Sequence, residues 1–139
     1  MTVTIVIVLS TLVVVVGIGL AWRNGTGYVR MGNGERIEAH DVRVAGEDFG
    51  DEATLLLFTS QQDPMSEPVR TILRKLALQN SGVRVVEVDL TAEGDLAGRY
   101  AITRTPSVLG LDKQHRIRAW TKGPADLAVL SEILRRCQS

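Results

Sequence analysis

Apolar and polar positions follow two different periods along most of the chain. Residues 54–59 form a continuous apolar run, which is typical of a central strand covered on both faces. Over 66–80 the apolar side chains recur every three or four positions, which predicts an amphipathic helix. Over 83–89 they alternate with polar ones, which predicts a second strand. The same criteria predict a short helix over 93–100, a strand over 107–111, a hairpin strand over 116–120 and a helix over 125–137.

The order of these elements, β-α-β-α-β-β-α, predicts an α/β domain over residues 51–139. We expect one mixed central sheet with helices on both of its faces. The first three strands are joined by helical crossovers, so we expect them to be parallel neighbours. The final hairpin then adds an antiparallel edge.

The N-terminus is apolar without a polar face, and Val3 to Trp22 contain no charged side chain. A helix of that length measures about 30 Å, which matches the hydrocarbon core of a bilayer. We therefore predict a transmembrane anchor over residues 1–22. A cleaved signal peptide is the alternative, since Gly19-Leu20-Ala21 is a small-x-small triplet. We favour the anchor because no Lys or Arg precedes the run, which is also longer than a usual signal-peptide core.

Residues 23–50 are expected to connect the anchor to the domain, because glycine and asparagine recur there. Within them, 41–44 can add a short edge strand. Positive charge follows the apolar run, at Arg23, Arg30 and Arg36, and does not precede it. The positive-inside rule therefore predicts a single-pass cell-membrane protein with its domain in the cytoplasm, the extracytoplasmic side being the alternative.

Charge and cysteine usage exclude several classes of function. The chain has 16 basic and 16 acidic residues and no long basic run, so nothing indicates nucleic-acid binding. Cys137 is the only cysteine, which excludes an intramolecular disulfide. His40 and His115 have no ligand-like spacing to it or to each other, so we expect no metal site and no cofactor. We interpret Cys137 as a partly buried thiol at a helix end.

Several segments together are similar to thioredoxins over residues 52–137. Phe58-Thr59-Ser60, the tetrapeptide Asp63-Pro64-Met65-Ser66 and the helix after it resemble the strand, redox motif and helix of that family. Val86-Glu87-Val88-Asp89 resembles its second central strand, Lys122-Gly123 matches the glycine after its last strand, and residues 99–108 carry its Thr-Pro loop. The chain therefore resembles the thioredoxin-like superfamily, and a membrane-anchored actinobacterial type that lacks the CxxC motif is the nearest type. The resemblance implies a thioredoxin-like fold with Thr105 and Pro106 in the cis-proline loop.

The redox apparatus of that family is missing. Asp63 and Ser66 stand at the positions of the two redox cysteines, and Leu57 replaces the buried acid that aids proton transfer in many thioredoxins. A carboxylate cannot form a mixed disulfide, and a serine hydroxyl without a base is a weak nucleophile. We therefore expect no catalytic residue and interpret the tetrapeptide as a helix start. Ser66 is the favoured N-cap, because a helix begun at Asp63 would carry Pro68 in its second turn.

The resemblance also implies a groove between the motif loop and the cis-proline loop, where the backbone can pair with an extended peptide. Its lining in this chain would be Gln61, Gln62, Met65, Arg104 and Thr105. The sequence thus favours a membrane-tethered, redox-inactive module that binds a protein partner or serves as an assembly or accessory subunit of a membrane complex. The alternative is residual or one-thiol redox activity through Cys137, although the C-terminal end of a helix disfavours a thiolate. Chaperone-like holding of unfolded chains would use the same groove without chemistry.

Overall fold

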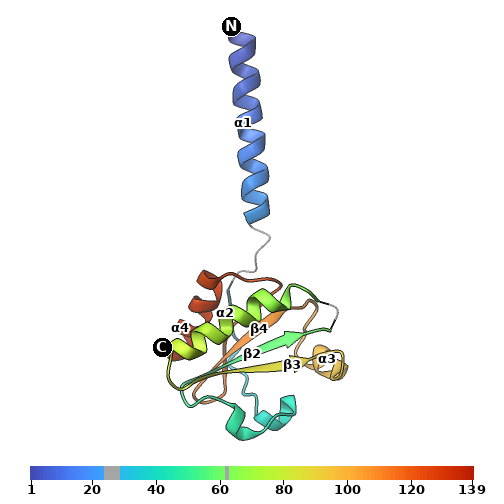
Figure 1. Ribbon diagram of the computed structural model, residues 1–139, viewed down its shortest axis with the longest axis vertical. Helices are drawn as coiled ribbons and strands as arrows, with labels where there is room; N and C mark the ends of the chain where they lie inside the picture. The colour runs from blue at the N-terminus through green and yellow to red at the C-terminus, as the bar shows by residue number, and fades with distance from the viewer. Residues whose placement is uncertain (24–28, 62) are drawn as a thin grey trace.

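A single helix precedes an α/β domain built on one five-stranded sheet (Figure 1). The computed structural model describes residues 1–23, 29–61 and 63–139. The strand order is β1-β5-β4-β2-β3. In chain order the elements are α1 (Thr2–Arg23), β1 (Arg30–Met31), the 3-10 helices η1 (Ala39–Val42) and η2 (Gly46–Asp48), β2 (Ala53–Thr59), α2 (Ser66–Gln79), β3 (Val83–Asp89), α3 (Gly94–Arg99), β4 (Ser107–Asp112), β5 (Ile117–Lys122) and α4 (Leu127–Gln138).

The sheet is mixed, as predicted, but the direction predicted for its third main strand is wrong. β2 and β3 are parallel, whereas β4 runs antiparallel to β2, with Phe58 opposite Ser107. The reason lies in the length of α3, whose six residues rise only about 9 Å. The seven residues of β3 span about 23 Å, so α3 cannot carry the chain back along the sheet. β4 therefore starts at the end of the sheet where β3 stops, and it runs back in the opposite direction.

Two apolar clusters cover the two faces of the sheet. Alternate side chains of β2 point to opposite faces, so Leu55 and Leu57 join one cluster, and Leu56 and Phe58 join the other. This explains why β2 reads as an unbroken apolar run. α2 and α4 cover the first face, where Leu73, Leu130 and Ile133 are fully buried. The second face is covered by α3 and by the segment that contains η1 and η2.

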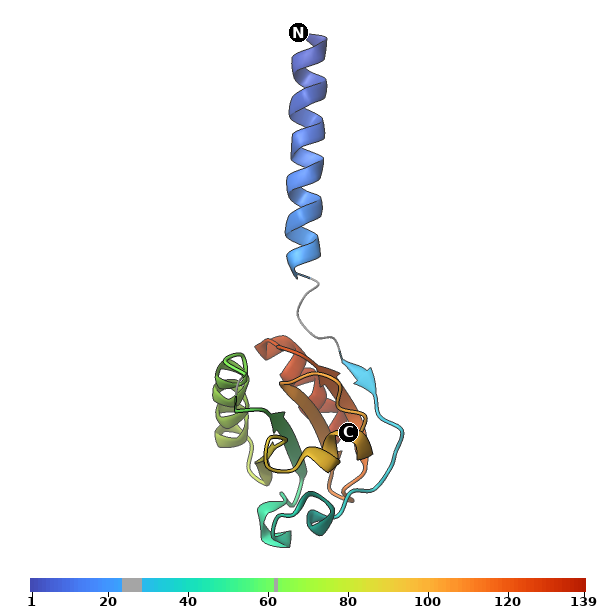
Figure 2. The ribbon, with the colours of Figure 1, turned by 90° about the vertical axis from the view of Figure 1, so that its right-hand side faces the viewer.

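The segment from β1 to residue 49 is part of this second layer. In Figure 2 it runs down one side of the domain and turns under its lower end. Ile37, Val42 and Phe49 are buried in the second cluster. The predicted edge strand at 41–44 is wrong, because η1 occupies Ala39–Val42 and the next residue, Arg43, has a left-handed backbone with φ 59°. The strand at this edge is instead β1, which pairs with β5.

Pairing along β5 continues beyond β1. The amides of Gly32, Gly34 and Ile37 donate to carbonyls of Arg118, Ile117 and His115, at 2.9–3.1 Å. A Cβ at Gly32 would lie 2.1 Å from the carbonyl oxygen of Ile117, so only glycine lets the two backbones approach this closely. Segment 30–37 thus covers the open edge of β5.

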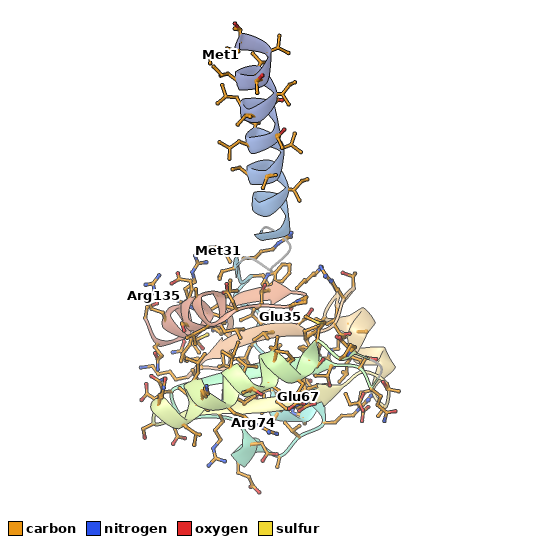
Figure 3. All side chains as sticks on the ribbon, turned by 45° about the horizontal axis from the view of Figure 1, so that its top comes forward. Met1, Met31, Glu35, Glu67, Arg74 and Arg135 are labelled. Atoms are coloured by element: carbon orange, nitrogen blue, oxygen red, sulfur yellow. The ribbon has the colours of Figure 1, made fainter. Side chains whose placement is uncertain are left out.

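The helix expected at the N-terminus is formed, as α1. Its described apolar side chains are exposed all along, and Figure 3 shows them projecting on every side. The hydroxyls of Ser10 and Thr11 donate back to the carbonyl oxygen of Ile7, at 2.9 and 2.8 Å. Within the described residues no helix has the combined length and apolarity needed to cross a membrane. The predicted transmembrane span at 1–22 is therefore not supported.

Candidate binding groove

The motif loop, residues 60–65, leads from the end of β2 into α2. The Oδ1 atom of Asp63 accepts a hydrogen bond from the backbone N–H of Met65, at 2.9 Å, and its carbonyl oxygen accepts one from Ser66, at 3.4 Å. Asp63 therefore closes the turn that starts the helix. One oxygen of the carboxylate is thus engaged by the backbone, and the other, Oδ2, is buried without a hydrogen-bond partner among the described residues.

The prediction that Ser66 caps α2 is wrong in detail. Ser66 is the first residue of the helix, its side chain is buried, and its hydroxyl has no hydrogen-bond partner in the described part of the chain. Met65 stands before it at the cap position with near-helical backbone angles, φ −78° and ψ −10°. The preceding turn, closed by Asp63, satisfies the N–H of Met65 and leaves the hydroxyl of Ser66 to point into the protein. Pro68 falls in the first turn, where its missing N–H leaves no helical bond unmade.

The second loop of the candidate groove precedes β4. The peptide bond between Thr105 and Pro106 is cis, and Pro106 is buried. Because Phe58 and Ser107 are opposite each other in the antiparallel pair, Pro106 follows on next to the end of β2. The hydroxyl of Ser107 donates to the carbonyl oxygen of Arg104, at 2.5 Å, which fixes the turn between them. The motif loop, which follows β2, and the Thr-Pro loop, which precedes β4, thus lie side by side at the same end of the sheet.

The side chains expected to line this groove differ in their surroundings. Met65 is exposed over 47% of its surface, and Thr105 is half-buried. Gln61 is exposed, and its backbone N–H donates to the hydroxyl of Thr91, at 3.1 Å. The guanidinium of Arg104 turns toward Gly123, where an added Cβ would lie 2.9 Å from its Cζ atom. Gln62 lies outside the described residues. Among those described, no hydrogen bond or ion pair joins the two loops.

A cavity of about 350 Å³ adjoins the motif loop and is rich in carboxylates. Arg70 of α2 makes two hydrogen bonds to Glu87 of β3, at 2.6 and 2.8 Å, and also pairs with Glu67. The hydrogen bonds from Arg70 lower the pKa of Glu87, and the same pair raises the pKa of Arg70. Sequence reasoning missed this group, since Glu87 looks only like the polar position of an alternating strand. The parallel pairing of β2 and β3 brings it within 3.3 Å of the Thr59 hydroxyl, close to the motif loop.

Leu57 and Cys137 are the two side chains that the sequence resemblance connects with redox chemistry. Leu57, where that resemblance predicts the position of a buried acid, is fully buried in the apolar cluster under α2 and α4. Cys137 is 3% exposed, and burial raises the pKa of its thiol to about 12. Its sulfur packs against Gly110, where an added Cβ would lie 2.6 Å away, part-way along β4 from the Thr-Pro loop. The thiol therefore stays protonated at neutral pH and lies away from the groove. No group of three or more His, Cys, Asp or Glu residues within the described residues could hold a metal ion.

The fold that holds these loops is thioredoxin-like. Among solved structures the chain is similar to a mutant thioredoxin from Halobacterium salinarum, with 16% identity, a TM-score of 0.56, and coverage of 64% of this chain and 77% of that one. It is also similar to mitochondrial thioredoxin 3 from Saccharomyces cerevisiae, with 18% identity, a TM-score of 0.53, and coverage of 61% and 78%. For the thioredoxin pre-protein of Schistosoma mansoni the values are 13% identity, a TM-score of 0.53, and coverage of 64% and 82%. No family model and no curated protein matches the sequence. Identities this low establish the fold alone.

Proposed function

We propose that this chain is a redox-inactive thioredoxin-like module that binds an extended segment of a protein partner between the motif loop and the Thr-Pro loop. The observation that carries the proposal is the state of the two positions where thioredoxins hold cysteines. Asp63 is engaged with the backbone of the helix start, and Ser66 is buried in the first turn. What remains at this edge of the sheet is a surface for binding, without a nucleophile.

An extended peptide is the favoured occupant because it can add backbone hydrogen bonds along the 104–106 loop. Met65 supplies an exposed, adaptable apolar side chain next to it, of the kind that recurs on protein-binding surfaces. The neighbouring cavity is lined by four carboxylates, and Arg70 pairs with two of them, Glu67 and Glu87. The other two belong to Asp63 and Asp89, and they would favour a partner segment with a basic side chain.

Site-specific photo-crosslinking in cells tests the binding surface. A photoreactive amino acid placed at Met65 should give a discrete cross-linked product with the full-length chain. The same amino acid at Leu78, which lies on α2 and is 87% exposed, is the matched control and should give no such product. Equal products from the two positions, or none from Met65, would contradict the proposed groove.

An insulin-reduction assay with dithiothreitol tests the absence of redox activity. The full-length chain should give no turnover above the rate with dithiothreitol alone, because its only thiol is buried and protonated. Turnover that Cys137→Ser abolishes would instead establish a one-thiol oxidoreductase and overturn the proposal.

We further propose that α1 holds the module at a membrane, with the domain on the cytoplasmic side. The support for this is the sequence without charge from Val3 to Trp22, together with the exposed apolar side chains of α1. The chain should then stay in the membrane fraction after carbonate extraction, and release into the supernatant would contradict the proposal. For the side of the membrane, Lys113→Cys provides an exposed thiol in the β4–β5 turn. It should resist an impermeant maleimide in intact cells and react after lysis, whereas labelling in intact cells would place the domain outside.

A further inference from the structure

The second face of the sheet contains a cavity of about 420 Å³ that is separate from the candidate groove. It exists because α3 is less than two turns long and leaves part of β4 and β5 uncovered. Segment 31–35, which follows β1 along the edge of β5, closes one side, and residues 99–102 close another. Figure 3 labels Met31 and Glu35, which lie on that segment. The volume lies within the usual range of small-molecule sites, roughly 300–1,000 Å³.

Most of the lining is apolar and aromatic. Leu109 and Ile117 come from the sheet and belong to the second cluster, and Ile102 and Trp120 pack against that cluster. Tyr100 completes the wall, and its ring rests against Phe58 at a centroid distance of 6.1 Å. An apolar wall of this kind favours a ligand with a compact hydrocarbon or aromatic body.

Two of the lining residues, Tyr100 and Thr121, have a buried hydroxyl without a hydrogen-bond partner among the described residues, and Tyr100 is the one in the aromatic wall. The hydroxyl oxygen of Tyr100 is buried, and no described group forms a hydrogen bond with it. Burial raises the pKa of Tyr100, so its hydroxyl is protonated at neutral pH and can donate. A buried hydroxyl without a partner is unfavourable, because it has lost its hydrogen bonds to water. A ligand oxygen placed in the cavity would restore one.

The cavity is lined by two cations, Arg99 and Lys122, and by one carboxylate, Glu35. Lys122 lines it, and its ammonium lies 5.1 Å from the centre of the Trp120 ring. In the described part of the chain no carboxylate pairs with Lys122. Arg99 pairs with Asp41, at 3.2 Å, whereas the Glu35 carboxylate accepts a hydrogen bond from the neutral amide of Asn33, at 3.3 Å, and keeps its negative charge. Lys122 is therefore the cation left to receive a carboxylate.

We propose that this cavity binds a small apolar monocarboxylate, with its hydrocarbon or aromatic body against Ile102 and Trp120. Its carboxylate oxygens accept hydrogen bonds from the ammonium of Lys122 and the hydroxyl of Tyr100. This site is independent of the peptide groove, so either proposal can fail without the other.

Three probes with one aromatic body test the proposal: 2-naphthoate, 2-naphthylmethanol and 2-naphthylmethylammonium. Each is titrated into the full-length chain held in lipid nanodiscs, and the methyl resonances of Ile102 and Ile117 report binding at the cavity. Because a hydrogen bond to a charged group contributes about 1.5 kcal/mol or more, naphthoate should bind at least about tenfold more tightly than the alcohol. The ammonium probe should bind more weakly still.

Variants connect that preference to the named groups. Lys122→Gln should remove the preference for naphthoate over the alcohol, and Lys113→Gln, a lysine in the β4–β5 turn, should leave it unchanged. Tyr100→Phe removes only the hydroxyl and should weaken naphthoate binding severalfold, with Ile102 and Ile117 shifts in the free protein close to those of the wild type. Equal affinity for acid and alcohol, tighter binding of the ammonium probe, no perturbation of the two methyls at millimolar probe, or an unchanged preference in Lys122→Gln would each overturn the proposal. An unchanged affinity in Tyr100→Phe would overturn the role of the hydroxyl.

Discussion

The two faces of the central sheet are covered in different ways. On one face, α2 and α4 are regular helices of 14 and 12 residues that bury a continuous apolar stripe. On the other, a six-residue helix shares the face with an irregular segment that contributes Ile37, Val42 and Phe49. The irregular face contains the cavity that we propose as a ligand site. The comparison indicates that stability is concentrated on the first face and that the second has room for a function of its own.

The largest loss of stability should come from a substitution on the regular face, which α2 and α4 cover. Leu57 is fully buried between the sheet and the two long helices, so Leu57→Ala leaves a void that they cannot fill. We expect the free energy of unfolding to fall by about 4 kcal/mol, measured by urea denaturation of the full-length chain in a mild detergent. Leu78→Ala, on the exposed side of α2, should cost less than about 0.5 kcal/mol. Similar losses for the two variants would show that the first face is not the rigid one.

A second variant tests how much the irregular segment contributes to the stability of the fold. Phe49 is 6% exposed and packs edge-on against the His115 ring, with a centroid distance of 4.9 Å. Phe49→Ala should therefore lower the free energy of unfolding by about 3 kcal/mol in the same assay. Glu47→Ala, an exposed neighbour on η2, is the control and should be close to neutral. A loss below about 1 kcal/mol would mean that the segment is a connector lying on the surface.

The smallest effect should come from the ion pair beside the motif loop. Glu87→Gln removes the charge that Arg70 engages, and because Glu87 is 38% exposed in its side chain we expect a loss of only about 0.5 kcal/mol. Arg70 lowers the pKa of Glu87 below its ordinary value of 4.5. The contribution of the pair is therefore complete above pH 4.5 and disappears as the pH falls through the folded-state pKa.

Urea denaturation at several pH values between 7 and 3 measures this dependence. The difference in stability between wild type and Glu87→Gln should shrink on acidification. Glu47→Gln is the control, because Glu47 forms no ion pair in the described chain, and its difference should stay near zero. A wild-type advantage that grows toward low pH would contradict the assignment of the charge pair.

The same contrast between the faces explains what could be predicted from the sequence. β2, α2, β3 and α4 were predicted within a few residues, because β2 is an unbroken apolar run and each of the other three keeps one hydrophobic period over its length. The direction of β4 could not be predicted that way. It depends on whether α3 is long enough to carry the chain back along the sheet. The hydrophobic period of the sequence does not show how long α3 is. η1 and η2 were missed because Ile37, Val42 and Phe49 follow neither a helical nor a strand spacing.

The candidate site divides along similar lines. The sequence predicted the motif loop and the Thr-Pro loop, because each of them is local in the chain. It did not indicate the pair between Arg70 and Glu87 or the unpartnered hydroxyl of Tyr100. Both depend on which distant segments the sheet brings together, and on the depth at which each side chain ends.

The pairing of segment 30–37 with β5 has a practical consequence for work on the isolated domain. An open strand edge offers free backbone N–H and C=O groups, and these readily pair with a second molecule. A fragment that starts at residue 51 would uncover the whole edge of β5 and also remove Ile37, Val42 and Phe49 from the core. Such a fragment should self-associate as concentration rises, whereas one that starts at residue 29 keeps the edge sealed. Light scattering of the two fragments would measure that difference.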